Sequence, residues 1–97
     1  MRRLALYIIH DRAIDEEVND VLKESDISCY TKWKDVVGKG THDPHMGDHV
    51  WPGLNNVTMV IIKSSEMNSL MDKIKALQSN FPAVSLRAFA TPVIDMI

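Results

Sequence analysis

Four short stretches with apolar and β-branched residues are spread along the chain, with polar segments between them, and the second of them alternates only loosely between polar and apolar positions. They are residues 4–9, 28–37, 57–62 and 84–90. We therefore predict four β-strands at these positions.

Two stretches between these runs carry apolar residues at the period of an α-helix. The first stripe is Ile14, Val18, Val21 and Leu22, and the second is Met67, Leu70, Met71, Ile74 and Leu77. Asp15 is the expected N-cap of the first helix, which should end near Ser25, and Ser64 or Ser65 is the expected N-cap of the second. Pro82 should end the second helix, because proline cannot continue it.

The predicted order of elements is β-α-β-β-α-β, which is the ferredoxin-like or split βαβ arrangement. The fold class is therefore α+β, a sandwich in which two helices cover one face of a four-stranded antiparallel sheet. Residues 1–97 are expected to form one domain of this kind.

The predicted strands are apolar on both faces. In the first strand Leu4, Leu6 and Ile8 point one way, while Ala5, Tyr7 and Ile9 point the other. A sheet with helices on only one side should show a polar open face. An apolar open face indicates that another subunit covers it, so we expect a homo-oligomer assembled through sheet faces.

Composition narrows the class of protein further. A net charge of −2 argues against nucleic-acid binding, which needs basic character and, on this fold, exposed aromatic residues on the sheet. No apolar stretch is long enough to span a membrane, and the apolar run near the start is too short for a signal peptide. The single cysteine, Cys29, excludes an internal disulfide and fits a reducing cytoplasm. We expect its thiol to be buried and inert.

The most unusual segment is residues 40–53, GTHDPHMGDHVWPG. It contains three of the four histidines and two aspartates: His42, His45, His49, Asp43 and Asp48. Neutral imidazoles bind zinc, copper and nickel well, and the aspartates would add oxygen ligands or orient the rings. The same residues could instead form a site for a non-metal ligand, or a solvated loop.

Other candidate residues have two interpretations each. Trp51 packs the segment back onto the sheet or offers a stacking surface to an adenine or a partner. His10 lines a cleft between subunits or merely ends the first strand. Trp33 is expected to pack between subunits. Histidine and aspartate in the segment could serve as acid–base groups of a small enzyme, although no serine or cysteine nucleophile stands beside them.

Four stretches of the chain resemble the PII family of signalling proteins: AIDEEVNDVLKESDIS, YTKWKDVVGKG, NNVTMVIIK and AFATPVI. They look like the first helix of the family, its second strand, its third strand and the end of its fourth. The second stretch ends in the Val-x-Gly-x-Gly pattern of the family at Val37, Gly38 and Gly40. The order and spacing of the four together carry the resemblance, over nearly the whole chain.

The resemblance implies a trimer whose intersubunit clefts bind adenine nucleotides, and a loop between strands two and three that docks onto a membrane transporter or an enzyme. Its ligand-binding positions fall here on Gly38, Gly40, Thr41 and Arg87, with Trp51 nearby. Where the family has a Gly-x-Gly-Lys segment, this chain has Val-Ser-Leu-Arg, in which Arg87 keeps the positive charge. We interpret the chain as a cytoplasmic, non-enzymatic regulator. The alternatives are a metal-tolerance protein using the histidines, or a small enzyme.

Overall fold

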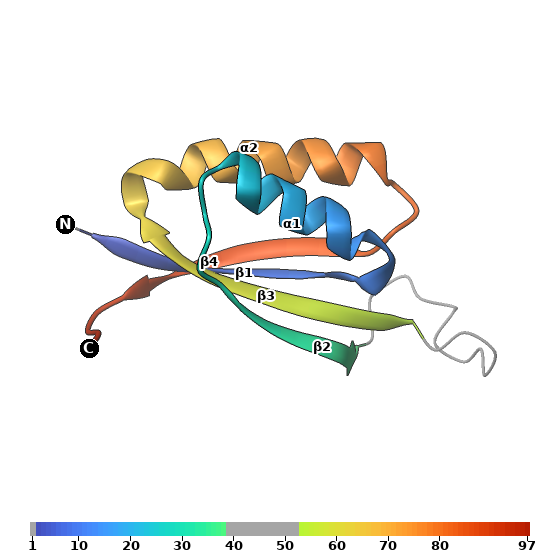
Figure 1. Cartoon of the computed structure of the whole chain (residues 1–97), viewed down its shortest axis with the longest axis horizontal. Helices are drawn as coiled ribbons and strands as arrows, with labels where there is room; N and C mark the ends of the chain where they lie inside the picture. The colour runs from blue at the N-terminus through green and yellow to red at the C-terminus, as the bar shows by residue number, and fades with distance from the viewer. Residues whose placement is uncertain (1, 39–52) are drawn as a thin grey trace.

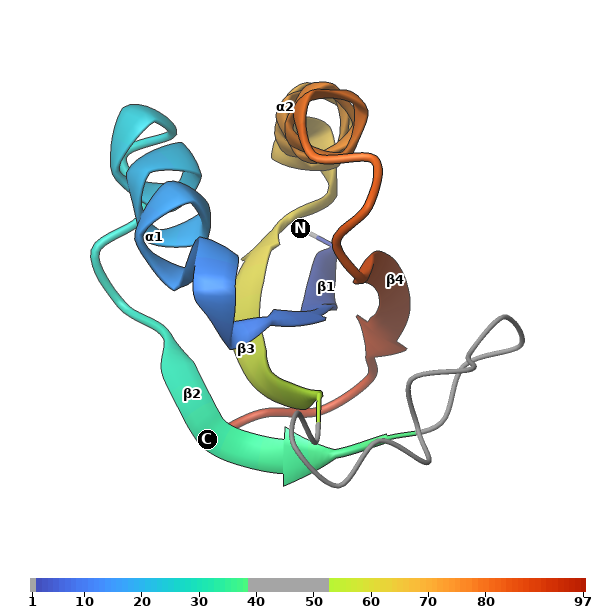
Figure 2. The same cartoon turned by 90° about the vertical axis from the view of Figure 1, so that its right-hand side faces the viewer.

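The computed structural model describes residues 2–38 and 53–97. The elements are β1 (Arg3–Asp11), a 3₁₀ turn (Arg12–Ile14), α1 (Asp15–Glu24), β2 (Thr31–Val37), β3 (Leu54–Lys63), α2 (Ser64–Asn80) and β4 (Leu86–Val93). The strands form one antiparallel sheet in the order β2-β3-β1-β4. Both helices lie on the same face of this sheet (Figures 1 and 2). The predicted ferredoxin-like βαββαβ fold is confirmed.

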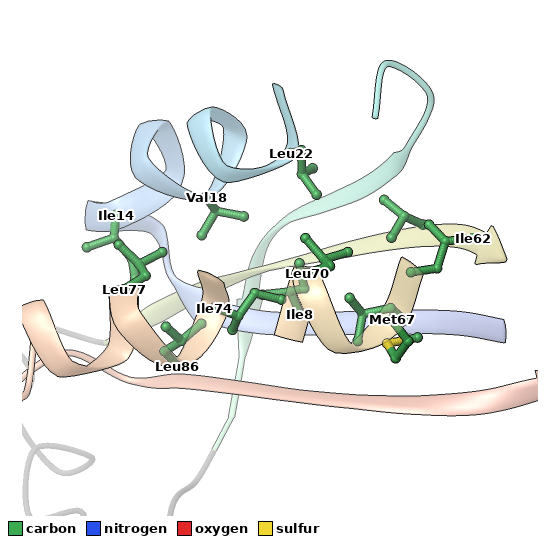
Figure 3. Packing of buried hydrophobic residues seen from close by; sticks show 12 residues of the cluster. Ile8, Ile14, Val18, Leu22, Ile62, Met67, Leu70, Ile74, Leu77 and Leu86 are labelled. Atoms are coloured by element: carbon green, nitrogen blue, oxygen red, sulfur yellow. The ribbon is translucent and has the colours of Figure 1, made fainter. Parts of the chain in front are cut away.

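The core lies between the two helices and the sheet (Figure 3). The 3₁₀ turn supplies Ile14, and the strands supply Leu6, Ile8, Val60, Ile62 and Leu86. The apolar stripes of α1 and α2 supply Val18, Leu22, Met67, Leu70, Ile74 and Leu77. All of these side chains are buried. The helical periodicity therefore marked the buried faces of both helices correctly, because burial of such a stripe is what stabilises a short helix.

The helix starts differ from the prediction. The N-cap of α1 is Ile14, and the Asp15 carboxylate makes no capping hydrogen bond. Asp11 caps the preceding 3₁₀ turn instead, accepting from the Ala13 N–H at 2.8 Å. The Asp15 side chain has stronger donors elsewhere, as described below. Helix α2 begins at Ser64 itself, after Lys63, without a side-chain cap.

The end of α1 is closed by a Schellman motif. The Ile27 N–H donates to the Leu22 carbonyl at 2.9 Å and the Asp26 N–H to the Lys23 carbonyl at 3.1 Å. This turn requires the left-handed conformation at Asp26, where φ is 59°. Glycine adopts that conformation without steric cost, whereas aspartate does so at some expense.

Strand β2 begins at Thr31, three residues later than predicted, and β4 is displaced to Leu86–Val93. Residues 26–30 form a connector that leaves α1 and runs outside the sheet before β2 starts (Figure 1). Cys29 lies on this connector and is exposed, so the prediction of a buried thiol was wrong. The residue was assigned to a strand that does not extend so far.

Candidate functional site

Most of the predicted site residues lie outside the described part of the chain. They are Gly40, Thr41, His42, Asp43, His45, Asp48, His49 and Trp51. Within residues 2–38 and 53–97, no group of three His, Cys, Asp or Glu side chains is placed to hold a metal ion. The predicted metal ligands thus remain a prediction from sequence.

Gly38 and Arg87 are the two predicted ligand-binding residues that the structure describes. Gly38 follows the end of β2, and Arg87 lies near the start of β4, both exposed and at the same end of the sheet. They belong to opposite edge strands, with β3 and β1 between them. At about 4.8 Å per strand spacing they are separated by roughly 14 Å across the sheet. One copy of the chain therefore does not bring them together.

The face of the sheet opposite the helices is largely apolar. The strand registers place its residues in rows across the sheet, of which the two central ones are Trp33–Val57–Ile9–Arg87 and Thr31–Met59–Tyr7–Phe89. Tyr7 and Phe89 stack with their ring centroids 5.1 Å apart. Phe89 is 49% exposed and Trp33 is 47% exposed. No helix in residues 2–38 or 53–97 covers this face (Figure 2).

We refer to this surface as the open face. The expectation that the sheet lacks exposed aromatic residues, which was one reason to exclude RNA binding, was wrong, because such residues lie on the open face. The charge argument is unchanged, since the chain as a whole is slightly acidic. Figure 2 shows the open face on the side of the sheet away from α1 and α2.

A network of polar side chains is buried under the first turn of α1, between the helix and the sheet. Its centre is Asp15, whose Oδ1 accepts from Lys32 Nζ at 2.7 Å and from Asn56 Nδ2 at 2.8 Å. Lys32 also donates to Asn19 Oδ1 at 2.6 Å. The Lys32 side chain is only 8% exposed, so its charge depends on these partners for compensation.

His10 lies beside this network and is fully buried. Its Nδ1 is 3.1 Å from the Asp11 carbonyl, which can only accept, so Nδ1 carries the proton. Nε2 then accepts from the Thr58 hydroxyl at 3.2 Å. His10 is therefore held as a neutral, fully hydrogen-bonded core residue. Since β1 continues to Asp11 and the ring faces the helices, His10 neither ends the strand nor lines an outer cleft.

Two pKa values in the network are displaced. Burial lowers the pKa of His10 below its ordinary value, although the Asp11 carbonyl and the nearby Asp15 charge oppose this. Burial alone would raise the pKa of Asp15, but hydrogen bonds from Lys32 and Asn56 outweigh it and hold that pKa below its usual range. At neutral pH the network therefore contains one ion pair and one neutral imidazole.

The network also fixes the path of β2 as it approaches segment 38–53. Asn56 Oδ1 accepts from the Asp35 N–H at 3.0 Å. Asp35 occupies a bulge between Trp33 and Val36 and has a φ of 57°. A bulge of this kind bends and twists a strand. Because Asn56 binds Asp15 and Asp35 at once, it ties the bend in β2 to the start of α1.

Sequence reasoning missed this network, although a signal for it was present. Asn56 and Thr58 occupy positions of β3 that point toward the helices, and His10 occupies such a position in β1. Polar residues at core-facing strand positions must find partners inside the protein. Their partners, Asp15 and Lys32, lie far away in sequence and are identified only by the fold.

The described residues contain no helix that is both long and apolar enough to cross a membrane.

The fold as a whole can be compared with known proteins. No family model and no curated protein sequence matches the chain. Among solved structures, it is similar to CPII, a nitrogen regulatory PII-like protein from Thiomonas intermedia K12 bound to ADP, AMP and bicarbonate. The TM-score is 0.75 at 20% identity, covering 96% of this chain and 91% of CPII. The chain has the PII-like fold.

Two further structures show the same likeness. The apo form of CPII matches with a TM-score of 0.66 at 18% identity, covering 96% of this chain and 92% of that chain. A protein from Thermus thermophilus described as PII-like signalling matches with a TM-score of 0.70 at 16% identity, covering 96% and 88%. The resemblance read from the sequence and the PII-like fold of the structure therefore agree.

Proposed function

We propose that this chain is a PII-like regulatory protein that assembles into a homotrimer. It binds a small ligand in the clefts between subunits and controls a membrane transporter or an enzyme through segment 38–53. The chain itself is not an enzyme in this proposal. The observation that carries this proposal is the open face, which exposes apolar and aromatic side chains. The structures with the same fold are described as regulatory proteins.

The open face supports assembly because solvent exposure of its side chains is unfavourable. Trp33, Phe89 and Ile61 are each more than a third exposed in a single chain. Covering them with another copy would gain roughly 25 cal/mol for each Å² of apolar surface removed from water. A closed ring of three copies gives every open face an equivalent environment.

The positions of Gly38 and Arg87 support a ligand site between copies. They lie at the same end of the sheet on opposite edge strands. A head-to-tail ring that brings the β2 edge of one copy to the β4 edge of the next would bring Gly38 of one copy toward Arg87 of the other. Arg87 would then offer its guanidinium to an anionic ligand such as a nucleotide phosphate or bicarbonate.

Segment 38–53 would complete this site, since it begins at Gly38. We propose Gly40, Thr41 and Trp51 as its nucleotide-binding residues. The alternative ligand is a divalent zinc, copper or nickel ion held by His42, His45 and His49, with Asp43 and Asp48 in support. The His-x2-His-x3-His spacing is the observation that favours the metal.

Light scattering tests the assembly, and a monomer at micromolar concentration would end the proposal. Calorimetric titration with ADP, AMP, bicarbonate, zinc, copper and nickel, each alone, tests the ligand. For a nucleotide, Arg87→Ala should abolish most of the binding. Arg12→Ala serves as the matched control, because Arg12 is also exposed but binds Asp35. For a metal, alanine at the three histidines should abolish binding while Arg87→Ala leaves it intact.

A further inference from the structure

The bulge in β2 adds one residue to that strand relative to its neighbour β3. Before the bulge Trp33 pairs with Val57, and after it Val36 pairs with Asn55. Between these two pairs β2 has two residues and β3 has one. In a regular strand, residues three apart point to opposite faces of the sheet. The extra residue instead puts Val36 on the same face as Trp33, which is the open face.

The pairing after the bulge decides where β2 delivers Gly38. Without the extra residue, Asp35 would pair with Asn55 and Val36 would move on to Leu54. Such a slip turns every following side chain to the other face and moves Gly38 by about 3.4 Å along the strand. In the structure Gly38 lies against Asn55, and a β-carbon on Gly38 would lie 3.4 Å from Asn55 Nδ2. The bulge therefore fixes both the face and the position of Gly38.

The bulge depends on the unusual backbone conformation of Asp35. Its φ is 57°, in the left-handed region that residues other than glycine adopt at a disadvantage. A residue in such a conformation persists where its surroundings hold it there. The Asp35 N–H donates to Asn56 Oδ1 at 3.0 Å. Asn56 is itself 4% exposed and donates to Asp15 at 2.8 Å, so it is a fixed acceptor for the bulge.

The carboxylate of Asp35 holds the bulge less firmly than the backbone does. Arg12 Nη1 donates to Asp35 Oδ1 at 3.1 Å, but the two side chains are 53% and 57% exposed. Exposed ion pairs of this kind contribute little to stability. The bond from the backbone N–H to Asn56 is therefore the main anchor. What position 35 requires is a residue that tolerates a positive φ, rather than a negative charge.

We infer that Asp35 is a positioning residue for the proposed ligand site: its bulge, held by Asn56, sets the register in which β2 presents Gly38. This inference rests on the proposed function, which puts Gly38 in the cleft between copies. The groups of a binding site must lie within about 0.5 Å of their productive positions. A slip of one residue along β2 is several times larger than this tolerance, so it should remove Gly38 from the site.

Three changes in β2 test the register. Asp35→Val introduces a β-branched residue, which strongly disfavours a positive φ, so β2 should slip into the regular pairing. Asp35→Gly adopts the left-handed conformation freely and should keep the bulge. Deleting Lys34 from the Asp35→Val chain removes the extra residue, and should return Val36 to Asn55 without a left-handed residue. A variant that was merely destabilised would not be rescued by a further deletion.

Backbone NOE contacts across β2 and β3 report the register by NMR, and circular dichroism checks the fold. The native chain, Asp35→Gly and the deletion chain should each show Val36 opposite Asn55. In Asp35→Val, residue 35 should lie opposite Asn55, and retention of the native pairing would overturn the inference. Should Asp35→Val fail to fold, the deletion decides: recovery of the fold supports the inference, and failure to recover overturns it.

Binding by the same chains tests whether the register matters to the site. Calorimetric titration uses ADP, AMP and bicarbonate, each alone. Asp35→Gly, the deletion chain and Arg12→Ala should bind like the native chain, whereas Asp35→Val should bind about tenfold more weakly or worse. Native affinity in a slipped Asp35→Val chain would overturn the positioning role and leave the proposed ligand site standing. If the native chain binds none of the three, the proposed site fails, and the positioning role fails with it.

Discussion

Asn56 is the residue through which the buried network reaches β2, and its replacement gives a sharp test of that network. Asn56 is 4% exposed, donates to Asp15 at 2.8 Å and accepts from the Asp35 N–H at 3.0 Å. In Asn56→Ala, Asp15 loses a donor while remaining partly buried beside Lys32. The Asp35 N–H loses its acceptor, and a small cavity is left near the start of β3.

The magnitude follows from these losses. A hydrogen bond to a charged group contributes about 1.5–3 kcal/mol, and a neutral one about 0.5–1.5 kcal/mol. The Asp35 N–H belongs to an exposed residue and can be solvated after the substitution, which reduces its share. We expect Asn56→Ala to lower the free energy of unfolding by about 2–4 kcal/mol.

Urea unfolding followed by circular dichroism, at one fixed protein concentration, measures this loss. Asn68→Ala is the matched control, because Asn68 is exposed on α2 and its replacement should change stability by less than about 0.5 kcal/mol. Equal stability of the two variants would refute the role given to Asn56. A second readout is the Asp15 pKa by NMR, which should rise in Asn56→Ala because a hydrogen bond that lowers it is lost.

Three further predictions concern single residues. Asp26→Gly should raise the free energy of unfolding by about 1 kcal/mol, because φ is 59° at this position and glycine adopts that conformation without steric cost. Asp26→Ala should give no such gain, and urea unfolding measures both variants. Burial lowers the pKa of His10 in the folded chain, so protonation of this side chain favours the unfolded chain. The free energy of unfolding should therefore be highest above about pH 6.5, the ordinary pKa of histidine, and should fall as the pH drops toward the folded pKa. His10→Gln should remove that dependence, and an unchanged pH profile would contradict it. Lys32→Ala should raise the Asp15 pKa, measured by NMR, toward its unfolded value, so that Asp15 contributes less to the loss of stability in acid than it does in the native chain. An unmoved pKa would show that Lys32 does not set it.

Helices and strands were predicted correctly where the local pattern of apolar residues is enough to specify them. The stripes of α1 and α2 repeat at the helical period, and most of those residues are buried, with Val21 and Met71 partly buried against the core. The central strands β1 and β3 were identified from their apolar runs and extend slightly beyond them. Edge strands were placed less well, because they are only partly buried and their ends depend on what they pair with. The late start of β2 and the exposure of Cys29 both follow from this.

The site was predictable only in part, for a similar reason. Gly38 and Arg87 were chosen by resemblance, and the fold places them on opposite edges of one sheet. Asp15 was assigned as a helix cap because aspartate is common there. In the structure the Lys32 ammonium and the Asn56 amide compete for its carboxylate. A charge-assisted hydrogen bond to a buried partner outweighs an exposed cap.

The sequence alone determined the order of the elements, the faces that the helices bury and the apolar character of both sheet faces. These properties come from periodicity, which acts over a few residues and leaves a clear mark in the chain. Only the tertiary structure decided which distant residues meet. It joined Asp15 to Lys32 and Asn56, and it started β2 at Thr31, opposite Met59, rather than at Ser28. Such contacts depend on strand register and on the path of connections, which no local pattern specifies.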